Sequence, residues 1–263
     1  MKKSKIVDYP SRHESFEDWF QTPLGRSMLA DQRRFLDQKL ARLTGARQLQ
    51  VSVSHRIPLA NGTDFSQKVM TTPKWFTSIP DGVVVCDADE LPFPGDSMDL
   101  VVLHHTADFS PYPHQALREA ARVLRGEGMI AVVGFNPVSV WGLRRLISRH
   151  HAGPWGGRFL MRGRMEDWLH LLGFQVDVSV TRFFRLPLQR SGRKASGRFG
   201  ERLTVSGLLP VGAYYCILAK KRVSACIPRR AAWRQNNVMG IPGTGTVSAS
   251  RGCPPQSLNH PED

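Results

Sequence analysis

The sequence lacks several features that would place it in a special class. It has four cysteines in 263 residues and no C-x-x-C pair, so we expect no disulfide framework and a reduced, cytoplasmic protein. No apolar run approaches the roughly 20 residues of a membrane-spanning helix. No apolar segment follows the basic residues 1–5, so a secretory signal is not expected. The histidines lack the spacing of zinc ligands, which argues against a metal site.

Positive charge is present in excess, but only in one half of the chain. The net charge is +14. Residues 1–140 hold 16 basic and 16 acidic residues, whereas residues 141–263 hold 20 basic and 6 acidic residues. Such an asymmetry is typical of a protein with an anionic substrate or a polyanionic partner, and equally of a solvated basic surface.

Apolar spacing predicts an α/β protein. Strands of apolar or alternating residues are expected near 49–54, 69–70, 83–86, 100–103, 129–133 and 211–219, and another is expected to begin at Phe174. Helices are expected near 26–43, 114–125, 139–148 and 165–172, with Thr22-Pro23 and Ser139 as start signals. Strands that alternate with helices favour a mostly parallel sheet. We therefore expect an N-terminal helical segment at 1–45, a main domain at 46–222 and, because its periodicity vanishes, a flexible tail at 223–263.

The most informative stretch is residues 83–134. It contains, in order, Asp87-Ala88, Leu91-Pro92-Phe93, Ser97-Met98-Asp99-Leu100-Val101, Leu117-Arg118-Glu119-Ala120-Ala121-Arg122-Val123-Leu124, Gly126 and Gly128. This series closely resembles the class I S-adenosylmethionine-dependent methyltransferases, in particular the branch with the ubiquinone/menaquinone-type C-methyltransferases. The chain looks most like the YafS-like members (methyltransferase type 11), closely over these fifty or so residues and in architecture over 15–222, with the tail outside the resemblance. The resemblance implies a Rossmann-like sheet of seven strands, the last antiparallel, with helices on both faces. It also implies S-adenosylmethionine as cofactor.

Asp87 and Ala88 are the main candidates for cofactor contacts. Asp87 follows an apolar strand, and ligands of open α/β sheets bind at the carboxyl ends of the strands. The resemblance gives the Asp87 carboxylate the adenine amine as partner and gives the Ala88 N–H a ring nitrogen. It also places the loop that begins at His104 and His105 near the cofactor, so we list both as weak catalytic candidates and His104 as a cofactor contact. Asp99, at the opposite edge, is expected to be structural, and Arg118 with Glu119 a solvated pair.

The loop after the first strand departs from the family pattern. The family carries a glycine-rich loop there, whereas this chain has Val51-Ser52-Val53-Ser54-His55-Arg56-Ile57-Pro58. Glycine allows close approach of backbone to a ligand, so here Ser52 and Ser54 would have to supply the contacts. The family's acidic residue after the second strand, which holds the ribose, has no evident counterpart.

These observations predict methyl transfer from S-adenosylmethionine to an unidentified, possibly anionic acceptor. Two alternatives stay open. The missing glycine loop favours a non-catalytic binding or regulatory protein of the same fold. The basic segment 182–202, with seven Lys and Arg residues and one Glu, favours an RNA-associated protein, although it has few aromatics for base stacking.

Overall fold

The computed structural model describes residues 9–148, 152–185, 187 and 212–222. All of them belong to one compact unit, Met1–Ser224. The predicted tail at 223–263 and most of the basic segment at 182–202 lie outside the described residues. No described helix is long and apolar enough to cross a membrane.

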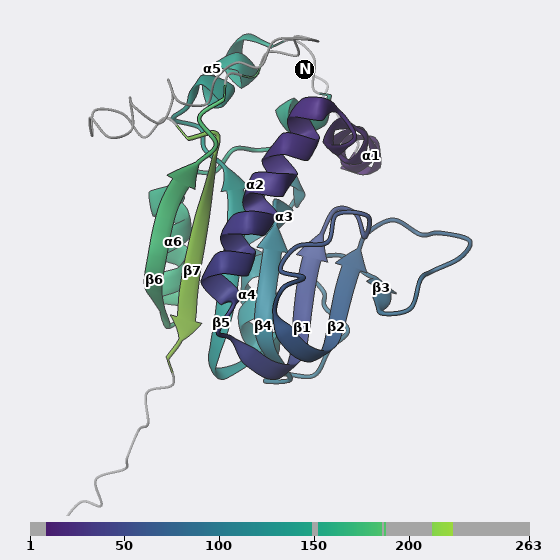
Figure 1. Cartoon of the computed structure of the whole chain (residues 1–263), viewed down its shortest axis with the longest axis vertical. Helices are drawn as coiled ribbons and strands as arrows, with labels where there is room; N and C mark the ends of the chain where they lie inside the picture. Colours follow the sequence, from purple (N-terminus) through teal and green to yellow (C-terminus); the bar gives the residue numbers. More distant parts are fainter. Residues whose placement is uncertain (1–8, 149–151, 186, 188–211, 223–263) are drawn as a thin grey trace, which may run out of the picture. The chain divides into compact units, whose positions relative to one another are not determined.

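A seven-stranded sheet forms the centre of the molecule (Figure 1). Its order is β3-β2-β1-β4-β5-β7-β6, and its strands are β1 (Thr44–Ser52), β2 (Asp64–Thr72), β3 (Val83–Val85), β4 (Met98–His104), β5 (Leu124–Phe135), β6 (Phe174–Arg182) and β7 (Tyr214–Lys221). The pairs among β1 to β5 are parallel, whereas β7 is antiparallel to both β5 and β6. The predicted sheet, with its last strand antiparallel, is confirmed.

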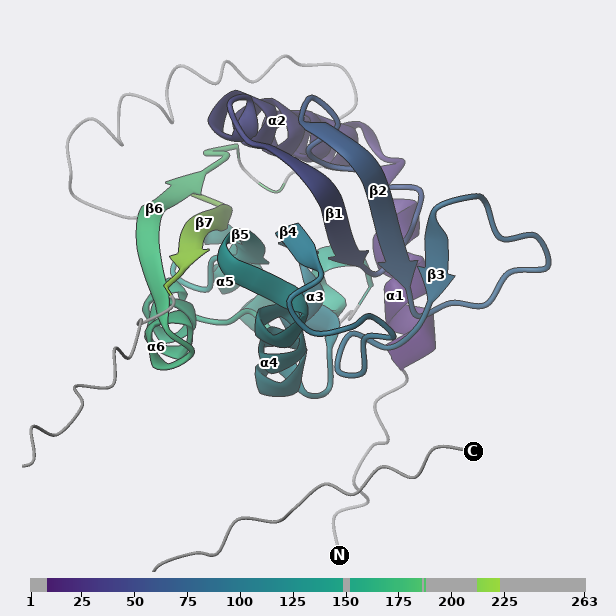
Figure 2. The ribbon, with the colours of Figure 1, turned by 90° about the horizontal axis from the view of Figure 1, so that it is seen from below.

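Helices cover both faces of this sheet (Figure 2). On one face, α1 (Tyr9–Phe20) and α2 (Pro23–Leu40) contribute Phe16, Phe20 and Leu36 to an apolar core. On the other face, α4 (Pro113–Val123) and α6 (Arg162–Leu171) build a second core. The remaining helices are α3 (Thr106–Phe109), α5 (Val140–Ile147) and the 3₁₀ turn η1 (Gly153–Gly156). The N-terminal helices are thus part of the main core rather than an appendage.

The expected start signals are found where helices begin. The Thr22 hydroxyl accepts a hydrogen bond from the Gly25 N–H at the start of α2. Ser139 does the same for the Gly142 N–H at the start of α5. Each side chain satisfies one of the N–H groups that a helix leaves without a partner at its first turn.

The connections between the first three strands contain no helix, and the sequence predicts none there. Residues 53–63 and 73–82 are irregular throughout. Helix α2 already covers the sheet beside β1, and Arg33 on it donates to the Pro58 carbonyl at 2.7 Å. Asp37, one turn later, accepts from the Gly62 N–H at 3.0 Å. The first crossover is therefore a loop that packs against α2, because the place of a crossover helix is taken.

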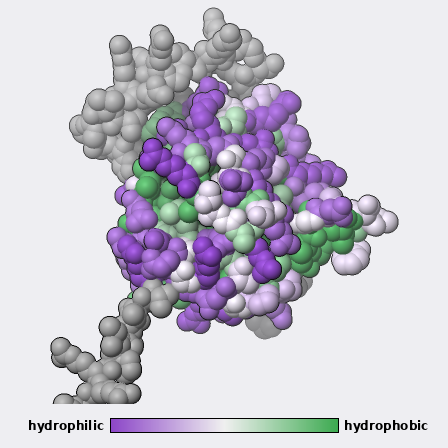
Figure 3. Space-filling model, turned by 60° about the horizontal axis from the view of Figure 1, so that its bottom comes forward, coloured by the Kyte–Doolittle hydropathy of each residue, from purple (hydrophilic) through white to green (hydrophobic). Residues whose placement is uncertain are grey.

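Asp99 secures the amino edge of the sheet, as expected of a structural residue. Its side chain is buried, and one oxygen accepts from the N–H groups of Ala46 and Arg47 at 2.7 and 2.8 Å. The other oxygen pairs with Arg125 at 2.5 Å. Asp99 thereby ties the starts of β1, β4 and β5 together. The surface on this side of the molecule is mostly hydrophilic (Figure 3).

Candidate functional site

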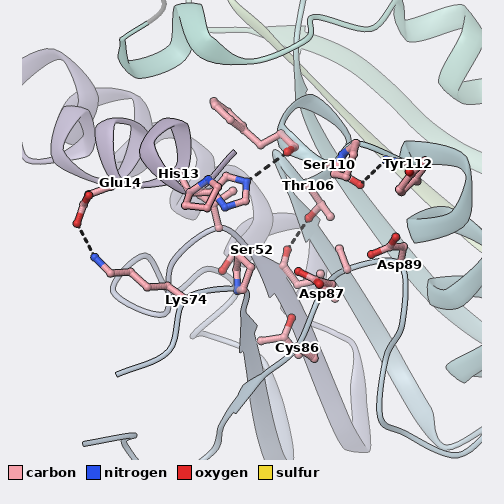
Figure 4. A pocket seen from close by; sticks show the side chains of 18 of the residues that line it. His13, Glu14, Ser52, Lys74, Cys86, Asp87, Asp89, Thr106, Ser110 and Tyr112 are labelled. Atoms are coloured by element: carbon pink, nitrogen blue, oxygen red, sulfur yellow. Dashed lines mark hydrogen bonds and ion pairs between the residues drawn. The ribbon is translucent and has the colours of Figure 1, made fainter. Parts of the chain in front are cut away.

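A cavity of about 690 Å³ opens at the carboxyl ends of the parallel strands (Figure 4). Its walls come from the ends of β1, β2 and β3, from the segment 106–112 after β4, and from α1. The volume is within the range of small-molecule and cofactor sites, and the carboxyl edge is where open α/β sheets bind ligands. This cavity is the candidate functional site.

Asp87 and Ala88 lie in this cavity, two and three residues after β3. The Asp87 side chain is exposed to it. Within the described part of the chain, the Asp87 carboxylate and the Ala88 N–H make no hydrogen bond. One acceptor and one donor are thus adjacent and available to a ligand, an arrangement that suits a ring with an amine beside a ring nitrogen.

A braced turn follows Asp87. Glu119 on α4 accepts a hydrogen bond from the Leu91 N–H at 3.1 Å and pairs with Arg122 at 2.7 Å. Arg122 in turn donates to the carbonyls of Leu91 and Phe93, both at 2.9 Å. The hydrogen bond from Arg122 lowers the pKa of Glu119. The expectation that Glu119 pairs with Arg118 in solvent is wrong. Glu119 instead joins α4 to the turn at Leu91, which follows the cavity residues 87–89.

Two buried glutamines hold the loop after β1, which lacks the family's glycine-rich run. Gln50 in β1 donates to the Ile57 carbonyl and accepts from the Leu59 N–H, both at 2.7 Å. Gln48, two residues earlier on the same strand face, donates to the Ala60 carbonyl at 3.4 Å. Side-chain amides on one strand face therefore fix the loop 53–63 without a helix. The spacing of two was visible in the sequence but was not recognised.

The two serines proposed for this loop differ in position. Ser52 lines the cavity, while its hydroxyl donates to the Ser54 carbonyl at 2.8 Å. Ser54 is fully buried, is not among the lining residues, and accepts from the Arg56 N–H. The structure keeps Ser52 as a candidate contact and turns the Ser54 hydroxyl into the loop.

His104 and His105 do not reach the cavity, which corrects the expectation for this loop. Both are completely buried. Gln32 of α2 connects them, with its oxygen 3.1 Å from His104 Nε2 and its nitrogen 3.0 Å from His105 Nε2. His105 Nδ1 is 2.8 Å from Asp108. Burial lowers the pKa of His105 to about 3 and lowers that of His104 as well.

The reason lies in the alternation of β4. Leu100 and Val102 belong to the core under α1 and α2, and His104 continues that side of the strand because side chains alternate with a period of two. His105 has a left-handed φ of 53°, and its ring packs against Phe16 and Phe135. These histidines are a polar bridge inside the core rather than cavity residues.

Helix α1 brings side chains to the cavity that sequence reasoning missed. His13 lines it, and its Nε2 is 3.2 Å from the Phe109 carbonyl. Burial lowers the pKa of His13, a change that the Phe109 carbonyl and Asp87 oppose. Glu14 also lines the cavity and pairs with Lys74 at 2.6 Å, just beyond β2. Only the fold could reveal that α1 reaches this edge.

No group of three or more potential metal ligands is found among the described residues. The cavity contains three carboxylates, Glu14, Asp87 and Asp89. Its other walls are largely apolar, with Val53 and Phe109 among them. The site therefore offers hydrogen-bond acceptors within an apolar enclosure, which suits an organic ligand with polar edges.

Comparison with known proteins agrees with this geometry. Residues 45–132 match the methyltransferase domain family. The uncharacterized protein YafS of Escherichia coli K12 is 36% identical over 140 residues, which are 53% of this chain and 55% of YafS. The rice chloroplastic 2-methyl-6-phytyl-1,4-hydroquinone methyltransferase 1 is 31% identical over 100 residues, or 38% of this chain and 28% of the rice protein. The aligned segments thus span about half or less of these relatives.

Solved structures show the same fold. A SAM-dependent methyltransferase from Archaeoglobus fulgidus has a TM-score of 0.56 at 18% identity, covering 78% of this chain and 98% of its own. The geranyl diphosphate C-methyltransferase of Streptomyces coelicolor has a TM-score of 0.50 at 14% identity, covering 75% and 80%. The sheet order, the cavity at its carboxyl edge and these comparisons lead to one conclusion: the chain has the α/β fold of the class I methyltransferases, and its residues 45–132 are similar to their domain family.

Proposed function

We propose that this protein binds S-adenosylmethionine in the cavity at the carboxyl edge and transfers its methyl group to a small-molecule acceptor. The observation that carries the proposal is the Asp87-Ala88 pair, which lines the cavity and whose carboxylate and N–H make no hydrogen bond within the described chain. A carboxylate acceptor followed by a backbone donor suits the amine and a ring nitrogen of adenine.

The cavity residues fit the cofactor. The volume of about 690 Å³ suits a nucleoside that carries an amino-acid chain. Asp87 and Ala88 would hold the adenine, and the braced turn at Leu91 would keep them in position. Ser52 and the backbone of Val53 would border the remainder of the ligand. Beyond Val53, the residues of the loop 53–63 do not line the cavity, and Gln50 holds two of them, Ile57 and Leu59.

The bound sulfonium would supply an electrophilic methyl group, and the protein's task would be alignment. Holding two reactants in line can provide a large part of a transfer rate. His13 is the imidazole at this cavity, and its lowered pKa keeps it neutral near pH 7. A neutral imidazole can accept a proton from an acidic acceptor as the methyl group arrives. His13 takes the place that His104 and His105 were expected to fill.

The alternatives gain less support. A purely non-catalytic role rested on the missing glycine loop, and the glutamine-held loop offers a structural substitute for it. The RNA-associated role rested on the basic segment. Of its residues, Arg182 pairs with Asp31 at 3.1 Å and Arg185 donates to Ser27 at 2.8 Å. Both contacts engage side chains of α2, so these two arginines already have partners within the protein.

The test is calorimetric titration of the full chain with S-adenosylmethionine and with S-adenosylhomocysteine. We expect saturable binding of both ligands below millimolar concentration. Methionine alone, which lacks adenine, serves as the control and should bind far more weakly. If neither nucleoside ligand binds at millimolar concentration, the proposed function is wrong.

A further inference from the structure

Helix α5 has an apolar stripe on the side that faces away from the protein. Trp141 is its buried anchor, 1% exposed and packed against Trp19 of α1 and Trp155 of η1. The opposite side is also apolar. Five large side chains there or just before the helix are 38–78% exposed, namely Val138, Val140, Leu143, Leu146 and Ile147. These five residues are called the α5 stripe below.

The α5 stripe is a concentration, not a random scatter. It supplies five of the ten exposed large apolar residues found in the described chain, within ten consecutive positions. Val140, Leu143 and Ile147 follow the spacing i, i+3, i+7, so they share one side of the helix. A helix that is apolar on two sides is normally covered on both. Here the described residues cover only the Trp141 side.

The surroundings of the α5 stripe are cationic. Between Glu127 and Glu166 the sequence contains six arginines and no acidic residue. Arg144 on α5 lies over the Trp155 ring at 5.0 Å. Arg145 donates to the Gly157 carbonyl at 2.7 Å. The guanidinium groups of both arginines thus lie on aromatic or backbone surface. Two further arginines, Arg12 and Arg158, lie close enough to Arg145 to influence it, together with one carboxyl, that of the buried Asp108.

We propose that the α5 stripe is a docking surface for an anionic lipid bilayer. Apolar side chains on one side of a helix that also carries two arginines, Arg144 and Arg145, complement acyl chains below a negatively charged headgroup layer. The proposal concerns peripheral attachment and is independent of the proposed methyl transfer.

The position of α5 gives this docking a consequence. The helix follows β5 at the carboxyl edge of the sheet, the edge where the cavity opens (Figure 1). Through Trp141 and Trp19 it packs on α1, the helix whose His13 and Glu14 line the cavity. Attachment through α5 would therefore bring the cavity edge to the bilayer surface.

The experiment is co-sedimentation of the full chain with vesicles of phosphatidylcholine alone and of phosphatidylcholine with phosphatidylglycerol. The double variant Leu143→Ser, Ile147→Ser removes two stripe residues without changing charge. Leu171→Ser is the matched control, because Leu171 is 84% exposed on α6, outside the stripe. Measurements at moderate and at high salt separate charge attraction, which salt screens, from apolar insertion.

We expect wild type and Leu171→Ser to bind the anionic vesicles equally. The affinity of the double variant for these vesicles should be lower by a factor of about ten or more. The difference should persist at high salt. The proposal is overturned if wild type does not sediment with anionic vesicles, or if the double variant binds them with the same affinity as wild type. A melting temperature several degrees lower in the double variant than in wild type would show that the chain itself covers the stripe. If wild type is a dimer and the double variant is a monomer, a second copy of the chain covers the stripe. Either result also overturns the proposal.

Discussion

The two halves of the carboxyl edge are built in different ways. In the segments that follow β3 and β4, the sequence resembles the pattern of class I methyltransferases. There, Glu119 and Arg122 on α4 hold the turn at Leu91. In the segments that follow β1 and β2, the family's glycine-rich loop and its acidic residue are absent. There, Gln50 holds an irregular loop beside α2. Both halves nevertheless line one cavity.

The comparison shows that a cavity wall can be kept while its supports are replaced. In the first half, backbone position is fixed by side chains from a crossover helix. In the second half it is fixed by amides within the sheet and by α2, a helix from the N-terminal segment. We expect changes in the second half to reduce mainly stability, and changes at Asp87 to reduce mainly ligand affinity.

The largest loss of stability is expected for Gln50→Ala, which removes the side chain that holds the loop after β1. The change leaves the buried Ile57 carbonyl and Leu59 N–H without partners, at about 1–3 kcal/mol for each group. Thermal unfolding should show a midpoint lower by roughly 5–15 °C. Gln67→Ala on neighbouring β2 is the control, because Gln67 is exposed. Equal midpoints for the two variants would mean that the glutamine does not support the loop.

A smaller loss is expected for Asp99→Asn, at the amino edge far from the cavity. It removes the charge that accepts two N–H groups and pairs with Arg125, which should reduce the free energy of unfolding by about 1–3 kcal/mol. Chemical denaturation measures this loss, with the exposed Asp64→Asn as control. S-adenosylmethionine affinity should stay unchanged. A large loss of affinity with intact stability would place Asp99 in the site and end its structural assignment.

The smallest effect is expected for Glu119→Gln, in the half that keeps the family pattern. The amide can still accept from the Leu91 N–H but loses its charge opposite Arg122, so stability should fall by roughly 0.5–1 kcal/mol. Affinity for S-adenosylmethionine should fall by only a fewfold, because the turn loosens while Asp87 remains. Titration calorimetry measures this affinity, with Glu90→Gln, a change at an exposed neighbour, as the control. Equal affinities for S-adenosylmethionine in the two variants would contradict the role of Glu119 in holding the turn.

Much of the sheet could be predicted from the sequence, since apolar runs such as 100–103 mark strands buried on both faces. Strand β2 was predicted only at Val69 and Met70, whereas it spans Asp64–Thr72. Its first half is largely exposed, so it lacks the apolar pattern on which the prediction depends. No helix was expected between β1 and β3, and none is found there. That α2 packs against the loop 53–63 is evident only from the folded chain.

The candidate site was predicted in part. Asp87 and Ala88 were placed at the cavity by their position after an apolar strand. His104 and His105 were misplaced, because their burial depends on α1 and α2, which reach β4 from more than 60 residues away. His13 and Glu14 were missed for the same reason. Alternation along β4 could have turned His104 toward the core, but nothing local places α1 over the cavity.

The most direct test of the account is the S-adenosylmethionine affinity of Asp87→Asn compared with Asp89→Asn. Both residues line the cavity, and both changes remove one charge without changing shape. A hydrogen bond to a charged group contributes about 1.5–3 kcal/mol. Calorimetry should therefore find affinity about ten- to a hundredfold lower for Asp87→Asn, and little changed for Asp89→Asn. If wild type binds and both variants bind equally well, Asp87 does not hold the adenine and the central assignment is contradicted.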